Sequence, residues 1–141
     1  EATLAAVEER RMALAGRGGD PGAEDALGRL VAEFIFQPGD VAIEAGARQR
    51  LTGVAEAMRR LGTSRVRVVG YSDRTGPADT NTELARTRAE EVGALFVEAG
   101  FPSARVETIS ALEAGLPLPV PTPEGVAEPR NRAARIFAAD G

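Results

Sequence analysis

Residues 70–90 read GYSDRTGPADTNTELARTRAE, and this stretch decides the fold because it joins a strand pattern to a helix pattern. Just before it, residues 65–71 alternate charged and branched side chains until Gly70 interrupts them. Such alternation is typical of a strand that is buried on one face. The sequence therefore predicts a strand at 65–71 with Val66 and Val68 pointing into the core.

The second half of the stretch predicts a turn followed by a helix. Gly76 and Pro77 let the chain double back after the strand. From Asn81 onward the apolar residues recur at helical spacing. Thr80 followed three residues later by Glu83 has the form of a capping box, which predicts the start of the helix.

The remaining elements are predicted from the same two periodicities and from turn residues. They are a helix near 24–32, a strand near 33–36, a helix ending at Gly62, a strand at 105–110, an extended proline-rich loop at 117–129 and a last strand at 133–138. The order βαβαβ-loop-β predicts a small α/β (α+β) sandwich, in which a mixed sheet carries its helices on one face.

The N-terminal region differs in composition from the rest. Residues 3–15 can form a helix, and five glycines and prolines then follow within seven positions. We expect residues 1–23 to be an N-terminal helix with a Gly-rich linker, and residues 24–141 to form one domain. A length of 141 residues suits a single hydrophobic core.

Composition excludes several classes of function. The chain has no Cys and no His, so the usual ligands of zinc, copper and haem and the thiol nucleophile are lacking. We expect no cofactor and no metal. The net charge of −4 argues against nucleic acid as a partner. No stretch is apolar enough for a membrane-spanning helix.

One residue of the predicted helix conflicts with the helical pattern. Arg88 falls in the middle of the apolar face, four residues from Leu84 and four from Val92. A guanidinium shielded from water must find acceptors, and Asp73, at the carboxyl end of the preceding strand, is the obvious one. Either Arg88 and Asp73 form a structural pair, or both face a crevice that takes a ligand with an ammonium and a carboxylate group.

This pattern of residues resembles the signature of the OmpA C-terminal-like peptidoglycan-binding domains. The resemblance extends over about residues 27–137, with Phe36 and Pro38-Gly39 ahead of the first long helix and Asn131-Arg132 before the last strand. The residues at the signature's spacing are Gly70, Asp73, Gly76, Asn81, Leu84, Arg88 and Ala89.

The resemblance implies a ligand and a set of site residues. In the family, the residues that correspond to Asp73 and Arg88 hold the amino and carboxylate groups of meso-diaminopimelate in the peptide stem of the cell wall. The expected binding residues are Asp73, Arg88, Asn81, Ser72, Leu84 and Arg132. The chain departs from the signature at four positions, with Ser72 for Thr, Thr80 for an aromatic, Ala85 for Ser and Ala133 for a second Arg.

The resemblance further implies a non-catalytic module that anchors an envelope protein to peptidoglycan in the periplasm of a Gram-negative bacterium, as part of an outer-membrane or envelope-anchored protein. One alternative is a protein-interaction or stator-type module with an internal Asp–Arg pair and no wall ligand. A second is a wall glycosidase using Asp73 and Asp79, but both lie in one turn-rich loop without the signal of an apolar pocket. A homodimer is a further possibility.

Overall fold

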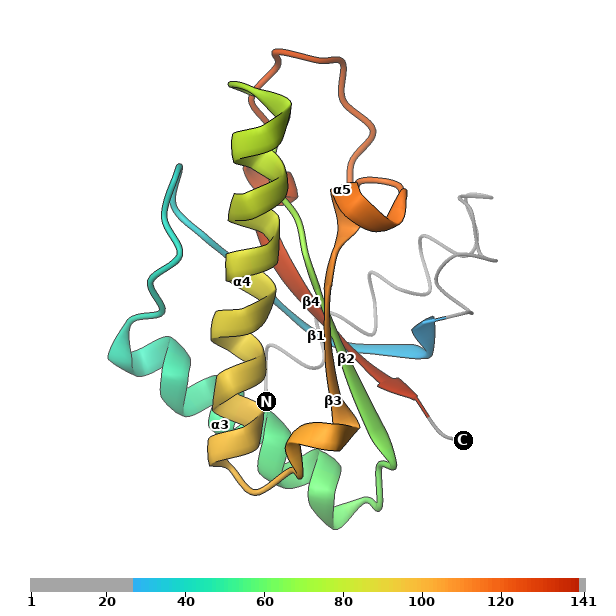
Figure 1. Ribbon diagram of the computed structural model, residues 1–141. Helices are drawn as coiled ribbons and strands as arrows, with labels where there is room; N and C mark the ends of the chain where they lie inside the picture. Colours follow the sequence, from blue (N-terminus) through green and yellow to red (C-terminus); the bar gives the residue numbers. More distant parts are fainter. Residues whose placement is uncertain (1–26, 140–141) are drawn as a thin grey trace.

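A computed structural model describes residues 27–139 of the chain (Figure 1). Two 3-10 turns, at Ser103–Arg105 and Pro129–Asn131, precede β3 and β4. The helices and strands are β1 (Arg29–Ile35), α3 (Ala45–Arg60), β2 (Arg65–Gly70), α4 (Ala78–Glu98), β3 (Val106–Ser110), α5 (Ala111–Ala114) and β4 (Ala133–Ala139). None of the helices in this described part is long and apolar enough to cross a membrane.

The four strands form one mixed sheet in the order β1-β4-β2-β3. β4 runs antiparallel to both of its neighbours, whereas β2 and β3 are parallel and are joined through α4. α3 and α4 lie on the same face of the sheet (Figure 1), where they form the larger hydrophobic cluster. The predicted sandwich of a mixed sheet with its two long helices on one face is therefore confirmed.

β4 is the centre of the core, and every residue in it is buried. Ala134, Ile136 and Ala138 point toward α3 and α4. Ala133 and Phe137 point to the opposite face, where they join a second hydrophobic cluster. A strand buried on both faces is mostly apolar, and the exception here is Arg135, whose Nε donates to the Glu33 carboxylate at 2.8 Å.

The helix predicted near 24–32 is wrong for residues 29–32, which belong to β1. The pairing of β1 with β4 is irregular between Leu30 and Ala32. Leu30 packs in the cluster on one face of the sheet, while Val31 and Ala32 both pack in the cluster on the other. Because both faces are buried and the irregularity breaks the alternation, the apolar residues imitate a helical repeat. The predicted N-terminal helix and linker at 1–23 lie outside the described residues.

The capping box predicted at the start of α4 is also wrong. The helix begins at Ala78, and Pro77 occupies the N-cap with an extended backbone and no side-chain cap. The backbone N–H of Asn81 already donates to the carbonyl of Pro77. Pro77 has a fixed φ and needs no amide donor, so it starts the helix before Thr80 can act as a cap. The end of α4 before Gly100 agrees with the prediction.

The proline-rich loop between β3 and β4 is held in place by Asn131, which is fully buried. Its side-chain oxygen accepts from the Val120 N–H at 2.9 Å, and its amide donates to the Val120 carbonyl at 2.9 Å and to Thr122 Oγ1 at 3.1 Å. The side chain thus pairs with the loop as another strand would. It also fixes the position of the backbone directly before Arg132.

Gly70 lets α4 approach β2 closely. A Cβ atom at this position would lie 1.8 Å from the backbone oxygen of Ala85 in α4. Gly70 does not have a positive φ, so its role is this close approach and not a backbone turn. Gly76, with a φ of 80°, does make the turn. The contact at Gly70 fixes the first half of α4 over the carboxyl end of β2.

We therefore expect Gly70→Ala to lower the free energy of unfolding by at least about 1–3 kcal/mol, because the new methyl group meets backbone atoms that cannot rotate away. Gly53→Ala is the matched control, since its Cβ atom meets nothing within 4 Å in α3. We expect the control to stabilise the protein by about 0.5–1 kcal/mol. Urea unfolding of the two variants checks this, and equal effects would contradict the packing role of Gly70.

Candidate functional site

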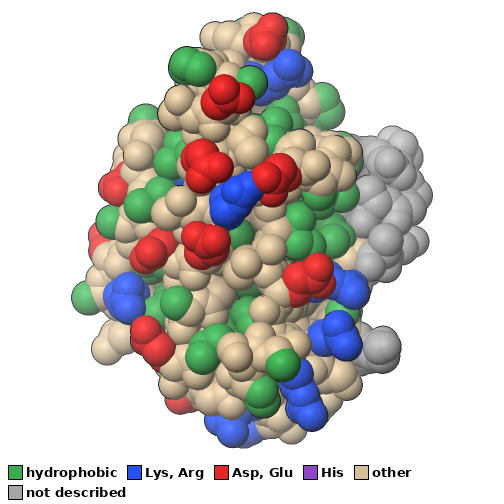
Figure 2. All heavy atoms as spheres, in the orientation of Figure 1, with side chains coloured by type: hydrophobic (Ala, Val, Ile, Leu, Met, Phe, Trp, Pro, Cys, Tyr) green, Lys and Arg blue, Asp and Glu red, His purple; other side chains and the backbone are tan. Residues whose placement is uncertain are grey.

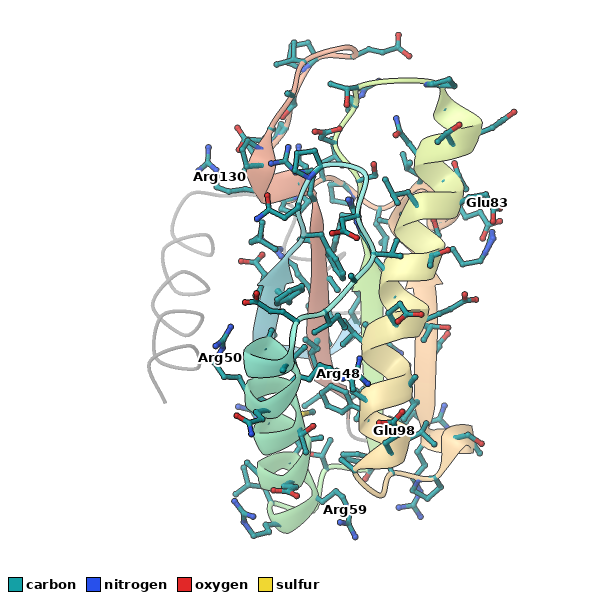
Figure 3. All side chains as sticks on the ribbon, turned by 90° about the vertical axis from the view of Figure 1, so that its left-hand side faces the viewer. Arg48, Arg50, Arg59, Glu83, Glu98 and Arg130 are labelled. Atoms are coloured by element: carbon teal, nitrogen blue, oxygen red, sulfur yellow. The ribbon has the colours of Figure 1, made fainter. Side chains whose placement is uncertain are left out.

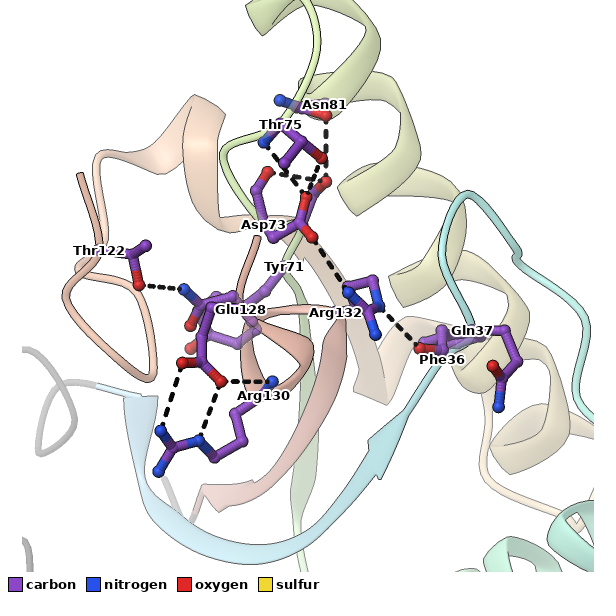
Figure 4. A network of polar contacts seen from close by, with 12 residues as sticks. Phe36, Gln37, Tyr71, Asp73, Thr75, Asn81, Thr122, Glu128, Arg130 and Arg132 are labelled. Carbon is purple, nitrogen blue, oxygen red and sulfur yellow. Dashed lines mark hydrogen bonds and ion pairs between the residues drawn. The ribbon is translucent and has the colours of Figure 1, made fainter. Parts of the chain in front are cut away.

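Five of the six expected binding residues gather where β2 ends, as their hydrogen bonds show, and Figure 4 labels three of them, Asp73, Asn81 and Arg132. Ser72 and Asp73 follow β2 directly, Asn81 and Arg88 project from α4, and Arg132 precedes β4. Asp73, Asn81, Ser72 and Arg88 are all buried. The site therefore depends on three segments that are distant in sequence.

Asp73 is only 6% exposed and is bonded on both oxygens. Its Oδ1 accepts from Thr75 Oγ1 at 2.6 Å and from the Thr75 N–H at 3.2 Å. Its Oδ2 accepts from Arg132 Nη1 at 3.1 Å (Figure 4). Burial by itself raises the pKa of this carboxyl, but the bonds from Thr75 and Arg132 outweigh it and leave the pKa below its ordinary value. Asp73 is therefore a carboxylate at neutral pH.

Arg132 closes the site on the side of β1. Besides its ion pair with Asp73, its Nε donates to the Phe36 carbonyl at 3.3 Å (Figure 4). The side chains of Arg132 and Asp73 are 14% and 8% exposed. A pair that keeps some contact with water can open at lower cost than a fully enclosed one.

Arg88 is completely buried and is bonded by three backbone carbonyls. Nε donates to Asp40 at 2.9 Å, Nη1 to Tyr71 at 3.0 Å and Nη2 to Gln37 at 3.3 Å. Its guanidinium also lies over the ring of Phe36, 5.1 Å from the centroid. The cation on the apolar face of the helix therefore joins the 37–40 loop to the end of β2.

The environment of Arg88 lowers the pKa of its guanidinium. Burial, and after it the nearby charge of Arg132, lower the pKa of Arg88 to about 10, although the charges of Asp73 and Asp40 act in the opposite direction. Arg88 remains a cation at neutral pH. All its acceptors in the described residues are neutral carbonyls, and a carboxylate would be a stronger acceptor.

Asp73 and Arg88 do not form the direct pair that the sequence suggested as the structural alternative. Among the ion pairs of residues 27–139, Asp73 is bonded to Arg132. Its charge still raises the pKa of Arg88, so the two groups belong to one electrostatic environment. An internal Asp–Arg pair does exist, but Arg132 supplies the cation.

Ser72 and Asn81 support the loop between β2 and α4. The Ser72 hydroxyl lies 3.2 Å from both Asn81 Oδ1 and the Asp73 carbonyl. The Asn81 amide donates to the Gly76 carbonyl at 3.5 Å. Leu84, the sixth expected residue, is half-buried one turn before Arg88 and joins neither hydrophobic cluster. Ser72 and Asn81 thus hold Asp73 in position.

A groove of about 500 Å³ adjoins the acceptors of Arg88. It runs between the end of β1, the 37–44 loop and α3, and its lining includes Phe36, Gln37 and Asp40. Asp73 and Arg88 do not line it. The 37–40 loop, whose residues are exposed, therefore separates this groove from the buried guanidinium.

Sequence reasoning missed the partners of both charged groups. Thr75, two residues after Asp73, could have been recognised as part of a local turn, because such a hydroxyl often bonds a neighbouring carboxylate. The carbonyls of Gln37 and Asp40 carry no sequence signal. In the described part of the chain, no group of three or more acidic residues is placed to hold a metal ion.

Comparisons with known proteins identify the family that the sequence pattern resembles. The model of the OmpA family matches residues 35–132. The outer-membrane lipoprotein YfiB of Pseudomonas aeruginosa is 39% identical over 61 residues, which are 43% of this chain and 36% of that protein. The chain spans about a third of the length of the curated relatives it matches.

Solved structures share the fold at low identity. The peptidoglycan-associated lipoprotein of Burkholderia pseudomallei superposes with a TM-score of 0.63 and 18% identity, over 74% of this chain and 87% of that one. The C-terminal domain of Helicobacter pylori MotB gives 0.63 and 21%, over 79% and 86%. These likenesses bear on the fold alone. Since the family model spans from the last residue of β1 to the residue before β4, the chain belongs to the OmpA family.

Proposed function

We infer that this chain binds peptidoglycan through the diaminopimelate of the peptide stem and anchors an envelope protein to the cell wall. The observation that carries the proposal is a buried guanidinium, Arg88, held only by neutral carbonyls among its described contacts, beside the carboxylate of Asp73. A ligand with a carboxylate and an ammonium would give each of these groups a charged partner.

Both charged groups already have partners in the free protein, so in the proposed binding the ligand has to replace some of them. A ligand ammonium would replace Arg132 on Asp73, where the guanidinium is the exchangeable partner and Thr75 is the fixed one. A ligand carboxylate would reach Arg88 once the exposed 37–40 loop gives up its carbonyl contacts. The planar fork of Arg88, which now bonds three carbonyls, suits two parallel bonds to a carboxylate. Ser72 and Asn81 keep Asp73 in place, and Leu84 provides an apolar wall.

The family membership makes the chain a non-catalytic binding domain and not an enzyme. Related proteins are outer-membrane lipoproteins or periplasmic domains, which supports a place in the cell envelope for this one. We place it in the periplasm, facing the wall. A single site with few contacts need not be tight, because many copies on a polymeric wall bind through multivalency. A homodimer stays a prediction.

A second candidate function is a protein-interaction or stator-type module without a wall ligand. The observation that favours it is the existing Asp73–Arg132 pair, which already satisfies the carboxylate. Sedimentation with purified peptidoglycan sacculi separates the two candidates, because only the wall-binding module pellets with them.

We expect Asp73→Asn to weaken binding to sacculi by about 10- to 150-fold, the loss of one charge-assisted hydrogen bond to the ligand ammonium. Asp79→Asn is the matched control, because Asp79 is exposed in the first turn of α4 and removes the same charge. The measurement is co-sedimentation over a range of sacculus concentrations. If the native chain and both variants pellet alike, or none pellets, the wall-binding proposal fails.

We expect Arg88→Lys to lose binding although the charge is retained, since an ammonium cannot make two parallel bonds to a carboxylate. The same change leaves carbonyls of the 37–40 loop without a donor, so the free energy of unfolding should fall by about 1–3 kcal/mol. Arg86→Lys, on the exposed side of α4, is the control. Chemical-shift titration with free diaminopimelate on folded protein separates binding from stability, and normal affinity in Arg88→Lys would rule out bidentate recognition.

Arg132→Gln should raise the pKa of Asp73, because the ion pair is one of the interactions that lower it. A carboxyl whose folded pKa is lowered stabilises the protein above its unfolded pKa and loses this effect as pH falls through the folded pKa. The variant should therefore be less stable than the native chain at pH 7, by about 1.5–3 kcal/mol, and the gap should close in acid. NMR titration of the Asp73 carboxyl and unfolding at both pH values test this. An unchanged pKa would show that the pair does not form in solution.

A further inference from the structure

Four arginines gather at the end of the molecule opposite the candidate site. Arg59 and Arg60 end α3, Arg65 begins β2 and Arg105 precedes β3. These segments meet because β2 and β3 are parallel and start at the same edge of the sheet, with Val66 paired to Val106. We call this end, formed by Arg59, Arg60, Leu61, Arg65 and Arg105, the arginine pole.

The arginine pole surrounds two hollows. One, of about 580 Å³, is lined by Arg59, Arg65 and Arg105 together with Gly62, Thr63, Ser64, Gly100, Phe101 and Pro102. The other lies between Arg59, Arg60 and Glu56, the one acidic residue that lines either hollow. Figure 2 shows basic side chains gathered at the lower end of the molecule, with most acidic ones on this face above them. Positive charge is therefore concentrated at the arginine pole, although the net charge of the chain is −4.

The arginines of the arginine pole have no charged partner among the described residues. In residues 27–139, Arg60, Arg65 and Arg105 are exposed, and no hydrogen bond or ion pair is formed by their side chains. Arg59 donates to the Ala99 carbonyl, a neutral acceptor. By contrast, Arg48, further up α3, lies 3.9 Å from Glu98, and Figure 3 places it well away from Arg59. A cluster of unpaired cations favours an anionic surface as partner.

An exposed leucine stands among these arginines. Leu61, the residue after α3, is 78% exposed, the highest value among the large apolar side chains that are exposed in the described part of the chain. Val97, near the end of α4 beside Gly100, is 40% exposed. An apolar side chain that projects between cations fits the boundary between lipid headgroups and acyl chains.

The strand ends also favour a surface at the arginine pole. Arg29 pairs with Ala138 and Arg65 with Ala139, so β1 begins and β4 ends at the arginine pole. Residues 1–26 therefore join the domain at this end, and the candidate wall site lies at the other. A tether through those residues would point the pole toward the surface to which the tether is fixed.

We propose that the arginine pole docks on a bilayer that exposes anionic phospholipid headgroups. Arg59, Arg60, Arg65 and Arg105 bind the headgroup phosphates, and Leu61 enters the headgroup region. The domain then bridges two surfaces, membrane at one end and wall at the other. The docking of the arginine pole on a membrane goes beyond the proposed wall binding and does not depend on it.

The test is co-sedimentation of the full chain with phosphatidylcholine vesicles that contain about one third phosphatidylglycerol, compared with pure phosphatidylcholine. We expect binding to the anionic vesicles only, weakened by high salt. The double variant Arg60→Gln, Arg65→Gln should bind about fivefold more weakly for each arginine removed. Leu61→Ser should also weaken binding, without any change in charge.

The matched control is Arg48→Gln, Arg50→Gln, which removes the same charge from the same protein elsewhere on α3 (Figure 3). Equal losses in the two double variants, equal binding to neutral vesicles, or no vesicle binding would overturn the proposal. So would competition by millimolar inorganic phosphate, because the pole would then be a site for a soluble anion. Sacculus binding should be unchanged in the Arg60, Arg65 variant, which keeps this test separate from that of wall binding.

Discussion

The architecture of the candidate site depends on one buried cation. Arg88 is enclosed in the helix layer, and its guanidinium is bonded to carbonyls of the 37–40 loop and of Tyr71. A buried guanidinium without acceptors would cost several kcal/mol, so the loop and the end of β2 must stay where they supply them. The geometry of three segments is thus set by the hydrogen-bonding demand of a single side chain.

The same constraint makes the site ready for exchange. Both charged groups that the family signature marks are satisfied in the free protein, Arg88 by neutral carbonyls and Asp73 by Thr75 and Arg132. Gln37 and Asp40 lie in an exposed loop and the Arg132 side chain retains contact with water, whereas Tyr71 is buried. In the binding that we propose, a zwitterionic ligand would replace Arg132 on Asp73 and the loop carbonyls on Arg88, and would give each of these two groups a charged partner.

The fold also separates charge along the direction of its strands. The carboxyl end of β2 and the start of α4 carry Asp73 and Asp79, while Arg65 at the amino end of β2 and Arg60 at the end of α3 have no ion pair within residues 27–139. A four-stranded sheet with two helices on one face has two well-separated ends, and each can contact a different surface. Such polarity suits the membrane docking and the wall binding that we propose.

The sequence by itself determined the mixed sheet with its two long helices, because the alternation around Val66 and Val68 and the helical repeat from Leu51 to Met58 are local patterns with clear periods. The family resemblance also gave Asp73, Arg88 and Arg132 as the charged members of the candidate site. The sequence did not determine the extent of β1, since a strand buried on both faces and irregular near Val31 has lost its alternation. Tertiary structure alone decided that Asp73 pairs with Arg132, that backbone carbonyls hold Arg88, and that Arg59, Arg65 and Arg105 share one hollow. These are contacts between distant segments, and backbone acceptors have the same chemistry in every residue, so no pattern of side chains could reveal them.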